Sequence, residues 1–304
     1  MLKSKFALLL LLSLGLLGSP LLSCLNTSAD LTLINGQNVM QHIKNIVSYG
    51  PHPAGSDAQK KVAQYLVQQM TSIGLKVHTH SFRPITPQGR LEMKNIWGVI
   101  KGDQDSVIIL ASHYDSKYFE NFSFIGANDS GSSSGLLLEL ARILSETNPT
   151  NHSLWIVFFD GEESFHEWTR IDSLYGSREF VKMLKRNDNL EKISSLILLD
   201  MVGDKNLQLF QDLNSSKWLN RIIWNKASQM GHGKIFAKRG NVVAEDDHLP
   251  FAREGVPVVD IINLNYKYWH RKEDTLDKLS THNLTAVGNV ILSSLAEISQ
   301  SLEH

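Results

Sequence analysis

Acidic residues recur where apolar runs of the sequence stop. The clearest case follows the run Ile156 to Phe159, where Asp160-Gly161 breaks the run and Glu162 and Glu163 come next. A strand that ends and at once presents paired carboxylates is a common way for an α/β enzyme to place reactive groups at the carboxyl edge of its sheet. Taken alone, the segment could equally be a solvated acidic turn after a buried strand.

Other acids and histidines end or follow strand-like runs in the same way. The whole group comprises His113, Asp115, Asp129, Glu162, Glu163, Asp200, Asp246, Asp247, His248 and His270. Carboxylate oxygens and imidazole nitrogens are zinc ligands, and a catalytic zinc site needs about three protein ligands and one open position. Each residue also has a simpler explanation, such as a helix cap for Asp129, a strand-end turn for Asp200 or a surface imidazole for His270. Because all of them are expected at one edge of one sheet, the group as a whole favours a metal site.

The elements that must position these residues alternate between strand-like and helical patterns. Continuously apolar runs predict strands buried on both faces at 106–112, 155–159, 195–199 and 256–262. Apolar residues at helical spacing predict helices at 38–49, 57–73, 131–144, 174–184, 215–230 and 287–302, with Ser56 or Asp57 as the cap of the second. Alternating segments at 75–82 and 91–100 predict two more strands, joined by a Pro-containing turn. This order of elements predicts an α/β sandwich around a mostly parallel sheet.

Composition limits the class of protein. The chain has 304 residues, of which 42% are hydrophobic and 20% charged, and its formal net charge is -1. These values suit one large domain, expected at 25–304. A near-neutral charge argues against nucleic-acid binding through a strong overall basic field, so we expect no nucleic-acid partner.

The first 24 residues have the pattern of an export signal. Lys3 and Lys5 precede an apolar run from Phe6 to Leu17, and small residues follow it. The only cysteine of the chain, Cys24, ends the sequence Leu-Leu-Ser-Cys, which resembles a bacterial lipobox. We therefore expect an exported protein that is either attached to a membrane through a lipid on Cys24 or secreted. A mature domain without cysteine contains no internal disulfide.

Several long segments of the sequence carry a family resemblance. They are HYDSKYF (113–119), GANDS (126–130), FFDGEESFHEW (158–168), DSLYGSREF (172–180), EDDHLPFAREGVPV (245–258) and WHRKEDT (269–275). In these segments the chain resembles glutaminyl-peptide cyclotransferases, whose fold is that of the M28 zinc aminopeptidases. The resemblance spans most of the mature chain. It implies a three-layer α/β sandwich around a central mixed, mostly parallel β-sheet.

The resemblance also implies roles for individual residues. Three positions match the ligands of a single zinc ion per chain: Asp129, Glu163 and His270. Three match a hydrogen-bonded catalytic acid network, with the first as general acid and base: Glu162, Asp200 and Asp246. Two match the aromatic walls of the substrate pocket: Trp168 and Trp269. The implied reaction is the cyclisation of an N-terminal glutamine to pyroglutamate with release of ammonia, and the implied partners are peptides and proteins that begin with glutamine. We expect the protein to be a monomer.

The chain departs from the animal cyclases at two places. Ser112 and Ser134 stand where those enzymes have a disulfide beside the site, and the segment 263–268 differs from their Pro-rich version. The first difference removes a local covalent link but no catalytic group. The second leaves the preference for residues after the glutamine undetermined.

Two other functions are compatible with parts of the pattern. A dinuclear zinc aminopeptidase would add His113 and Asp200 to the three ligands and use Glu162 as the base for a bridging water. All these ligand types are present, whereas Trp168 and the EDDHLPF segment argue against this alternative. A non-catalytic binding module on the same fold normally goes with lost metal ligands, and none is lost here.

Overall fold

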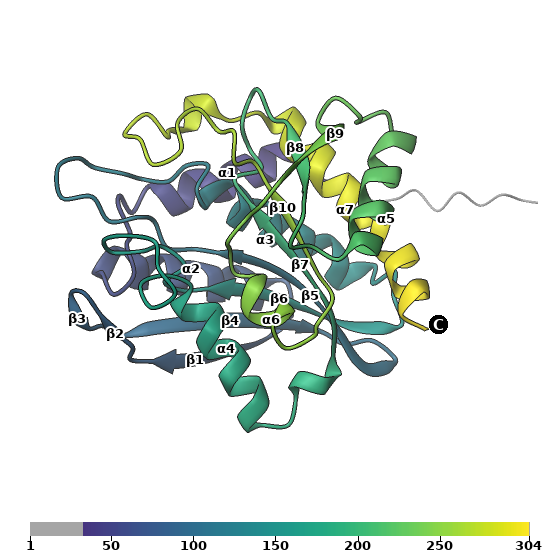
Figure 1. Cartoon of the computed structure of the whole chain (residues 1–304), viewed down its shortest axis with the longest axis horizontal. Coiled ribbons are helices and arrows are strands. Elements are labelled where there is room, and N and C mark those ends of the chain that lie inside the picture. The colour runs from purple at the N-terminus through teal and green to yellow at the C-terminus, as the bar shows by residue number, and fades with distance from the viewer. Residues whose placement is uncertain (1–32, 304) are drawn as a thin grey trace, which may run out of the picture. The chain divides into compact units, whose positions relative to one another are not determined.

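A six-stranded sheet forms the centre of the computed structural model, which describes residues 33–303 (Figure 1). In spatial order the strands are β1 (Lys76–Phe82), β4 (Met93–Ile100), β6 (His152–Phe159), β5 (Gln104–His113), β7 (Ile193–Asp200) and β10 (Val258–Ile262). The last four are mutually parallel, whereas β1 and β4 pair antiparallel at one edge. This topology confirms the prediction of a mixed, mostly parallel sheet.

Helices cover both faces of the sheet and make the predicted three layers (Figure 1). On one face lie α1 (Gly36–Val47), α2 (Asp57–Ser72), α3 (Gly131–Glu146), α5 (Lys217–Gln229) and α7 (Thr281–Leu302). On the other face lie α4 (Tyr175–Arg186) and the short α6 (Leu249–Ala252). None of the helices in residues 33–303 is long and apolar enough to span a bilayer.

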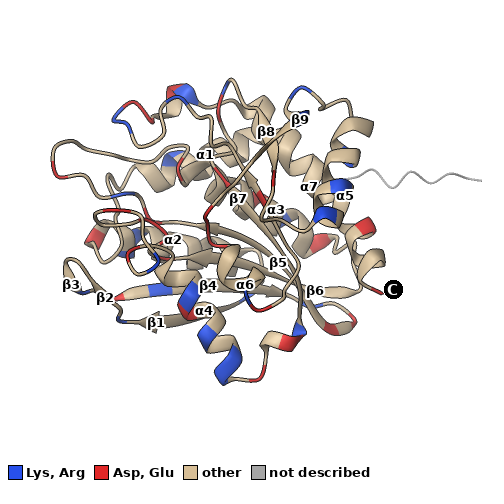
Figure 2. Cartoon of the chain, in the orientation of Figure 1, with Lys and Arg blue, Asp and Glu red and all other residues tan. Residues whose placement is uncertain are grey.

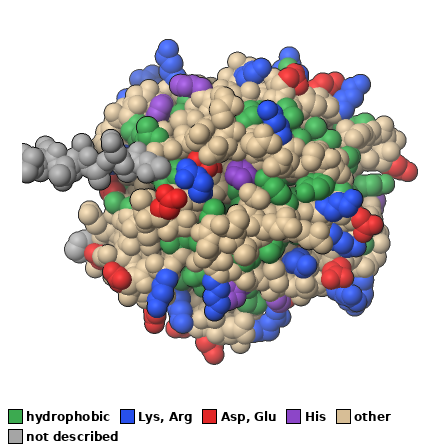
Figure 3. Space-filling model, turned by 180° about the vertical axis from the view of Figure 1, so that it is seen from behind, with side chains coloured by type: hydrophobic (Ala, Val, Ile, Leu, Met, Phe, Trp, Pro, Cys, Tyr) green, Lys and Arg blue, Asp and Glu red, His purple; other side chains and the backbone are tan. Residues whose placement is uncertain are grey.

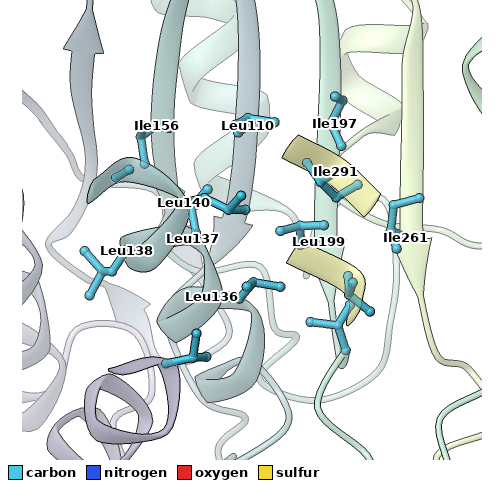
Figure 4. Packing of buried hydrophobic residues seen from close by; sticks show 14 of the residues in the cluster. Leu110, Leu136, Leu137, Leu138, Leu140, Ile156, Ile197, Leu199, Ile261 and Ile291 are labelled. Carbon is cyan, nitrogen blue, oxygen red and sulfur yellow. The ribbon is translucent and has the colours of Figure 1, made fainter. Parts of the chain in front are cut away.

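The central strands β5, β6, β7 and β10 are largely apolar because each face is covered. Ile108 and Leu110 of β5 belong to the core cluster beneath α3 and α7, while Ile109 and Ala111 belong to the cluster beneath α4. Successive side chains of a strand point to opposite faces, so burial on both sides requires an unbroken apolar run. Figure 4 shows the first cluster, in which strand residues such as Leu110 meet leucines of α3 and Ile291 of α7.

Side-chain caps set the starts of α1, α2 and α7. The Asn35 side chain accepts hydrogen bonds from the amides of Gln37 and Asn38 at the start of α1. Ser56 accepts from the amide of Gln59 at the start of α2, which confirms one of the two predicted caps. Each cap satisfies backbone donors that have no partner inside the helix.

Short elements outside the central sheet were not expected from the sequence. They are the hairpin β2 (Ile85–Thr86) and β3 (Gly89–Arg90), the parallel pair β8 (Leu209–Asp212) and β9 (Phe236–Val242), α6, and the 3₁₀ helices η1 (Leu190–Lys192) and η2 (Leu276–Lys278). β9 leads directly into the segment 243–248, which carries part of the predicted site. The pair β8–β9 therefore holds a functional loop although its strands are short and polar.

Charged residues are distributed unevenly over the ribbon. Figure 2 shows Lys and Arg on outer helices such as α4 and α5, and Asp and Glu also in loops near the strand ends. The opposite face of the molecule, seen in Figure 3, carries charged side chains of both signs interspersed with apolar ones. The predicted export signal at 1–24 lies outside the described residues and stays a prediction.

Candidate active site

The carboxyl ends of the parallel strands bring the predicted site residues together. β5 ends at His113 and β7 at Asp200, while Glu162 and Glu163 closely follow β6. A cavity of about 280 Å³ opens at this edge of the sheet. It is lined by all the predicted ligands, acids and tryptophans: Asp129, Glu162, Glu163, Trp168, Asp200, Asp246, Trp269 and His270.

The three predicted metal ligands point at one another. Nε2 of His270 lies 3.0 Å from Oε1 of Glu163 and 3.3 Å from Oδ2 of Asp129. The Oδ2 atom of Asp129 is buried and accepts no hydrogen bond from any described residue. Burial lowers the pKa of His270, but Glu163 and Asp129 outweigh it and raise that pKa to about 10. Two carboxylates and one imidazole whose ligand atoms lie within 4.8 Å of one another fit a zinc ion.

A second potential metal-binding group consists of His113, Asp129 and Asp200, and it shares Asp129 with the first group. Nε2 of His113 is 3.3 Å from Oδ1 of Asp129 and 3.3 Å from Oδ1 of Asp200. All three residues are buried. The structure thus places together the residues that the two-metal alternative requires. The ligand types alone do not separate one metal from two.

The predicted general acid and base, Glu162, is a buried carboxyl group in an acidic setting. Burial raises its pKa well above the usual range; His113 opposes this effect, while Asp246 and Glu163 add to it. Burial also raises the pKa of Asp200 to about 6 and that of Asp246 to about 7. The resemblance implied hydrogen bonds within this acid network. The hydrogen bonds found in residues 33–303 include none that joins these three carboxyl groups directly, so their contact here is electrostatic.

Asp115 holds the loop that presents both glutamates. Its Oδ1 accepts a hydrogen bond from the amide of Glu162 at 3.1 Å and its Oδ2 one from the amide of Glu163 at 3.3 Å. Oδ1 also lies 3.5 Å from Nδ1 of His113. One buried aspartate therefore positions the acid-base candidate and a ligand candidate together.

Asp274 performs the same task for the loop of Asp129. It accepts hydrogen bonds from the amides of Asn128 at 2.9 Å and Asp129 at 3.2 Å, and from the hydroxyl of Tyr266 at 2.7 Å. Gly126 allows this loop to fold tightly: its φ is +56°, and a Cβ there would lie 2.0 Å from the carbonyl oxygen of Asp129. Asp274 joins the loop of one ligand to the loop that carries His270.

Two further contacts support the ligands from outside the cavity. Nζ of Lys117 lies 3.3 Å from Oε2 of Glu163 and donates to the carbonyl of Ser164 at 2.9 Å. The rings of Phe119 and Phe124 meet the imidazole of His270 edge-on, with ring centres 5.9 and 6.1 Å away. Partners of this kind orient metal ligands and tune their affinity.

Comparison with known proteins identifies the family. Residues 95–295 match the model of peptidase family M28. The chain belongs to this family. It is 30% identical over 265 residues to the glutaminyl-peptide cyclotransferase of Drosophila melanogaster, covering 78% of this chain and 75% of that protein. It is also 30% identical over 313 residues to the glutaminyl-peptide cyclotransferase of Boiga irregularis, covering 88% and 84%.

Solved structures of this M28 fold include both cyclases and exopeptidases. A glutaminyl cyclase from an Acidobacteriales bacterium matches with a TM-score of 0.85 and 36% identity, over 90% of this chain and 98% of that one. A Zn-dependent exopeptidase from Parabacteroides distasonis matches with a TM-score of 0.81 and 26% identity, over 88% and 99%. The predicted resemblance and fold are confirmed.

The tryptophans of this M28 chain stand at the mouth of the cavity. The side chains of Trp168 and Trp269 are 37% and 42% exposed. The indole nitrogen of Trp168 donates a hydrogen bond to Oε2 of Glu245 at 3.2 Å, and the ring of Trp269 lies 4.8 Å from that of His270. Both line the cavity.

Ser112 and Ser134 meet at one backbone atom. Each hydroxyl donates to the carbonyl oxygen of His113 at 2.8 Å. These positions match the disulfide of animal cyclases. In this M28 chain the end of β5 is linked to the first turn of α3 by the Ser134 bond and by a hydrogen bond of 2.9 Å between the hydroxyls of Ser112 and Ser133.

The sequence did not reveal the supporting roles of Asp115, Lys117 and Asp274. All three occur inside the motifs HYDSKYF and WHRKEDT, which were used only as parts of a family pattern. Their position within those motifs was the available signal. Their contacts depend on the direction of individual backbone amides, which periodicity does not give.

Proposed function

We propose that this protein cyclises the N-terminal glutamine of peptides and proteins to pyroglutamate. The α-amine nitrogen attacks the side-chain carbonyl carbon, so one carbon–nitrogen bond forms and the bond to the amide nitrogen breaks. The amine loses a proton and the departing nitrogen gains one, which releases ammonia. No water is consumed and no oxidant is needed.

Asp129, Glu163 and His270 would hold one zinc ion per chain. A zinc ion in that position acts as a Lewis acid that polarises the side-chain carbonyl of the glutamine. The contacts of Asp115, Asp274 and Lys117 then serve to keep the ligand atoms converged. The convergence of these ligand atoms within 4.8 Å supports this assignment.

Glu162 would move the proton. It accepts the proton of the α-amine and passes it to the departing nitrogen. A shuttle of this kind works best when its pKa lies near the working pH. Burial raises the pKa of Glu162 and neighbouring Asp246 raises it further, which favours a group able both to accept and to return a proton. Asp200 and Asp246 would act through Glu162 by setting the charge around it.

Trp168 and Trp269 would hold the substrate curled. In an intramolecular reaction the main requirement is that the amine and the carbonyl carbon be kept at bonding distance. Two aromatic side chains at the cavity mouth restrict the chain that follows the glutamine. Their position beside the lining acids supports this role.

The observation that carries the proposal is the placement of Glu162. It is a buried acid next to a ligand candidate in a cavity with aromatic walls, in a chain related to proteins named glutaminyl-peptide cyclotransferases. Incubation of the zinc-loaded protein with a Gln-initiated peptide should produce a mass loss of one ammonia molecule. Glu162→Gln should abolish that loss while zinc content is retained. No change in any peptide would instead support a non-catalytic binding module.

A dinuclear aminopeptidase is the second candidate, favoured by the group of His113, Asp129 and Asp200. In that case the peptide should lose a whole residue rather than ammonia. Zinc content would also be two ions per chain instead of one. Mass spectrometry of the peptide and metal analysis of the protein together separate the two functions.

We also propose that the protein is exported and works as a monomer. Lys3, Lys5, the apolar run that follows and Cys24 support export, with lipid attachment at Cys24 or secretion as its two forms. Replacing Cys24 by Ser should release a lipid-anchored protein from the membrane fraction and leave a secreted one unchanged. Light scattering of the mature protein tests the monomer.

A further inference from the structure

The cavity has a buried acidic floor and an exposed apolar rim. Its lining carboxylates are all buried except one, and the rim is made of the exposed Trp168, Val243 and Trp269 and the half-buried Leu264. The exception is Glu245, which is exposed at the mouth. A glutamine side chain is short enough to occupy the floor, so the residue that follows it must pass the rim.

Glu245 holds a fixed place at this rim. Its Oε2 accepts the hydrogen bond of the Trp168 indole at 3.2 Å, which ties it to one wall of the cavity. It comes directly before Asp246, whose side chain is buried. The carboxyl group of Glu245 therefore lies at the mouth of the cavity and that of Asp246 at its floor.

No cation neutralises Glu245 within the described chain. The ion pairs of up to 4.0 Å found in residues 33–303 pair the acids Glu163, Glu179 and Glu254 with lysine or arginine, but not Glu245. Lys117, which contacts the ligand candidate Glu163, already forms an ion pair with that residue and donates a hydrogen bond to Ser164. The mouth therefore presents an uncompensated negative charge.

We propose that Glu245 is a specificity-determining residue that disfavours substrates with an acidic second residue and favours those with a basic one. The inference rests on the proposed cyclase function and specifies its substrate class: peptides of the form Gln-Lys or Gln-Arg first, Gln followed by an apolar residue next, and Gln-Asp or Gln-Glu last. The apolar rim contacts the stem of a long basic side chain while its head stays in water near Glu245.

The effect is electrostatic and of moderate size. Two unit charges about 7 Å apart near a protein surface change a rate by roughly three- to tenfold, because solvent screens them. Screening also predicts a salt dependence. The contrast between basic and acidic substrates should shrink between 0.1 and 1 M salt, over which the Debye length falls from about 10 Å to about 3 Å.

The test compares three peptides that differ only at the second residue, Gln-Lys, Gln-Ala and Gln-Glu. For the zinc-loaded protein, kcat/KM should fall in that order. Glu245→Gln keeps an acceptor for the Trp168 indole and removes the charge. It should reduce the Gln-Lys to Gln-Glu ratio roughly ten- to hundredfold, because the attraction of Lys and the repulsion of Glu are both lost. Glu191→Gln removes an exposed charge at the opposite edge of the sheet and should leave the ratio unchanged.

Trp168→Phe separates charge from positioning. It removes the indole donor and leaves the carboxylate, so all three values should fall together, while the Gln-Lys to Gln-Glu ratio should stay closer to the wild-type value than in Glu245→Gln. If Gln-Ala is cyclised but Glu245→Gln leaves the Gln-Lys to Gln-Glu ratio unchanged, the specificity inference is wrong and the cyclase function stands. If none of the three peptides is cyclised, the proposed function fails and this inference fails with it.

Discussion

At the scale of single residues, one device recurs around the cavity. Three buried aspartates each accept hydrogen bonds from two successive backbone amides of a loop. Asp115 accepts hydrogen bonds from the amides of residues 162 and 163, Asp274 from those of 128 and 129, and Asp172 from those of 165 and 166. Charge-assisted bonds of this kind are stronger than neutral ones, so they hold irregular backbone in place. The functional side chains stand on loops, and these aspartates give those loops the order that a strand or helix would otherwise supply.

Replacing Asp115 by Asn should weaken metal binding without unfolding the protein. The amide group of Asn offers only one acceptor oxygen for the amides of Glu162 and Glu163, and its own N–H group faces the other. Loss of such a supporting contact typically lowers metal affinity by about 10–100-fold. Competition with a zinc chelator measures the affinity. Asp105→Asn, at an exposed residue near the start of β5, the strand that precedes Asp115, should have no effect.

The buried carboxyl group of Asp260 should make the stability of the protein depend on pH. Asp260 lies fully buried, with Oδ2 3.5 Å from Nδ1 of His248. Burial and the carboxylates of Asp246 and Asp200 raise the pKa of Asp260 well above its usual range. Above the unfolded value of about 3.9 the folded chain still holds a proton that the unfolded chain has released. Stability is therefore lost as pH rises from that value towards the folded pKa.

Asp260→Asn should thus stabilise the protein at pH 8 more than at pH 5, since Asn does not ionise. Each kcal/mol relieved should raise Tm by roughly 2–4 °C. Thermal unfolding at the two pH values measures the difference. The exposed Asp103 serves as the control, because Asp103→Asn should change Tm equally at the two pH values. A gain that is larger at pH 5 would contradict the assigned direction.

At the scale of elements, Ser112 and Ser134 couple the end of β5 to α3. The Ser134 hydroxyl donates from α3 to the carbonyl of His113. The Ser112 hydroxyl donates to the same carbonyl from within β5 and also lies 2.9 Å from the hydroxyl of Ser133 in α3. Either Ser→Ala variant leaves the other donor in place and should cost little. The double variant removes both, and a hydrogen bond contributes about 0.5–1.5 kcal/mol. The loss of unfolding free energy in the double variant should therefore exceed the sum of the single losses by about 1 kcal/mol, measured by denaturant titration. Strict additivity would show that the two hydroxyls act independently.

The sequence predicted those elements whose burial leaves a pattern. The runs at 106–112, 155–159 and 195–199 are apolar because both faces of β5, β6 and β7 are covered, and their ends place Glu163 and Asp200 together. β9 escaped prediction because FAKRGNV is mostly exposed and polar, with only Phe236 and Ala237 buried. It is held by pairing with β8 and by the contacts of these two residues with Trp224 of α5. Contacts such as that of Asp274 with two backbone amides also escaped, because they depend on loop geometry rather than on periodicity.

At the scale of the whole molecule, the site concentrates negative charge inside the fold. Asp129, Glu162, Glu163, Asp200 and Asp246 are all buried around one cavity, and His113 and His270 are the imidazoles in contact with them. Buried like charges oppose folding unless a cation compensates them. The rest of the structure, with its two covered sheet faces, must outweigh this cost whenever the metal is absent.

Removal of the metal should therefore lower the stability of the entire chain. A ligand present at 100 times its dissociation constant stabilises the folded state by about 2.7 kcal/mol. For a chain of this size that corresponds to a Tm difference of roughly 5–10 °C between the zinc-loaded and chelated protein. Differential scanning calorimetry with and without chelator measures it. In Glu163→Gln, which removes a ligand candidate and one buried charge, the chelator should have almost no effect, while the apo Tm should equal or exceed that of the chelated wild type. A chelator effect of the same size in both proteins would place the stabilising ion away from Asp129, Glu163 and His270.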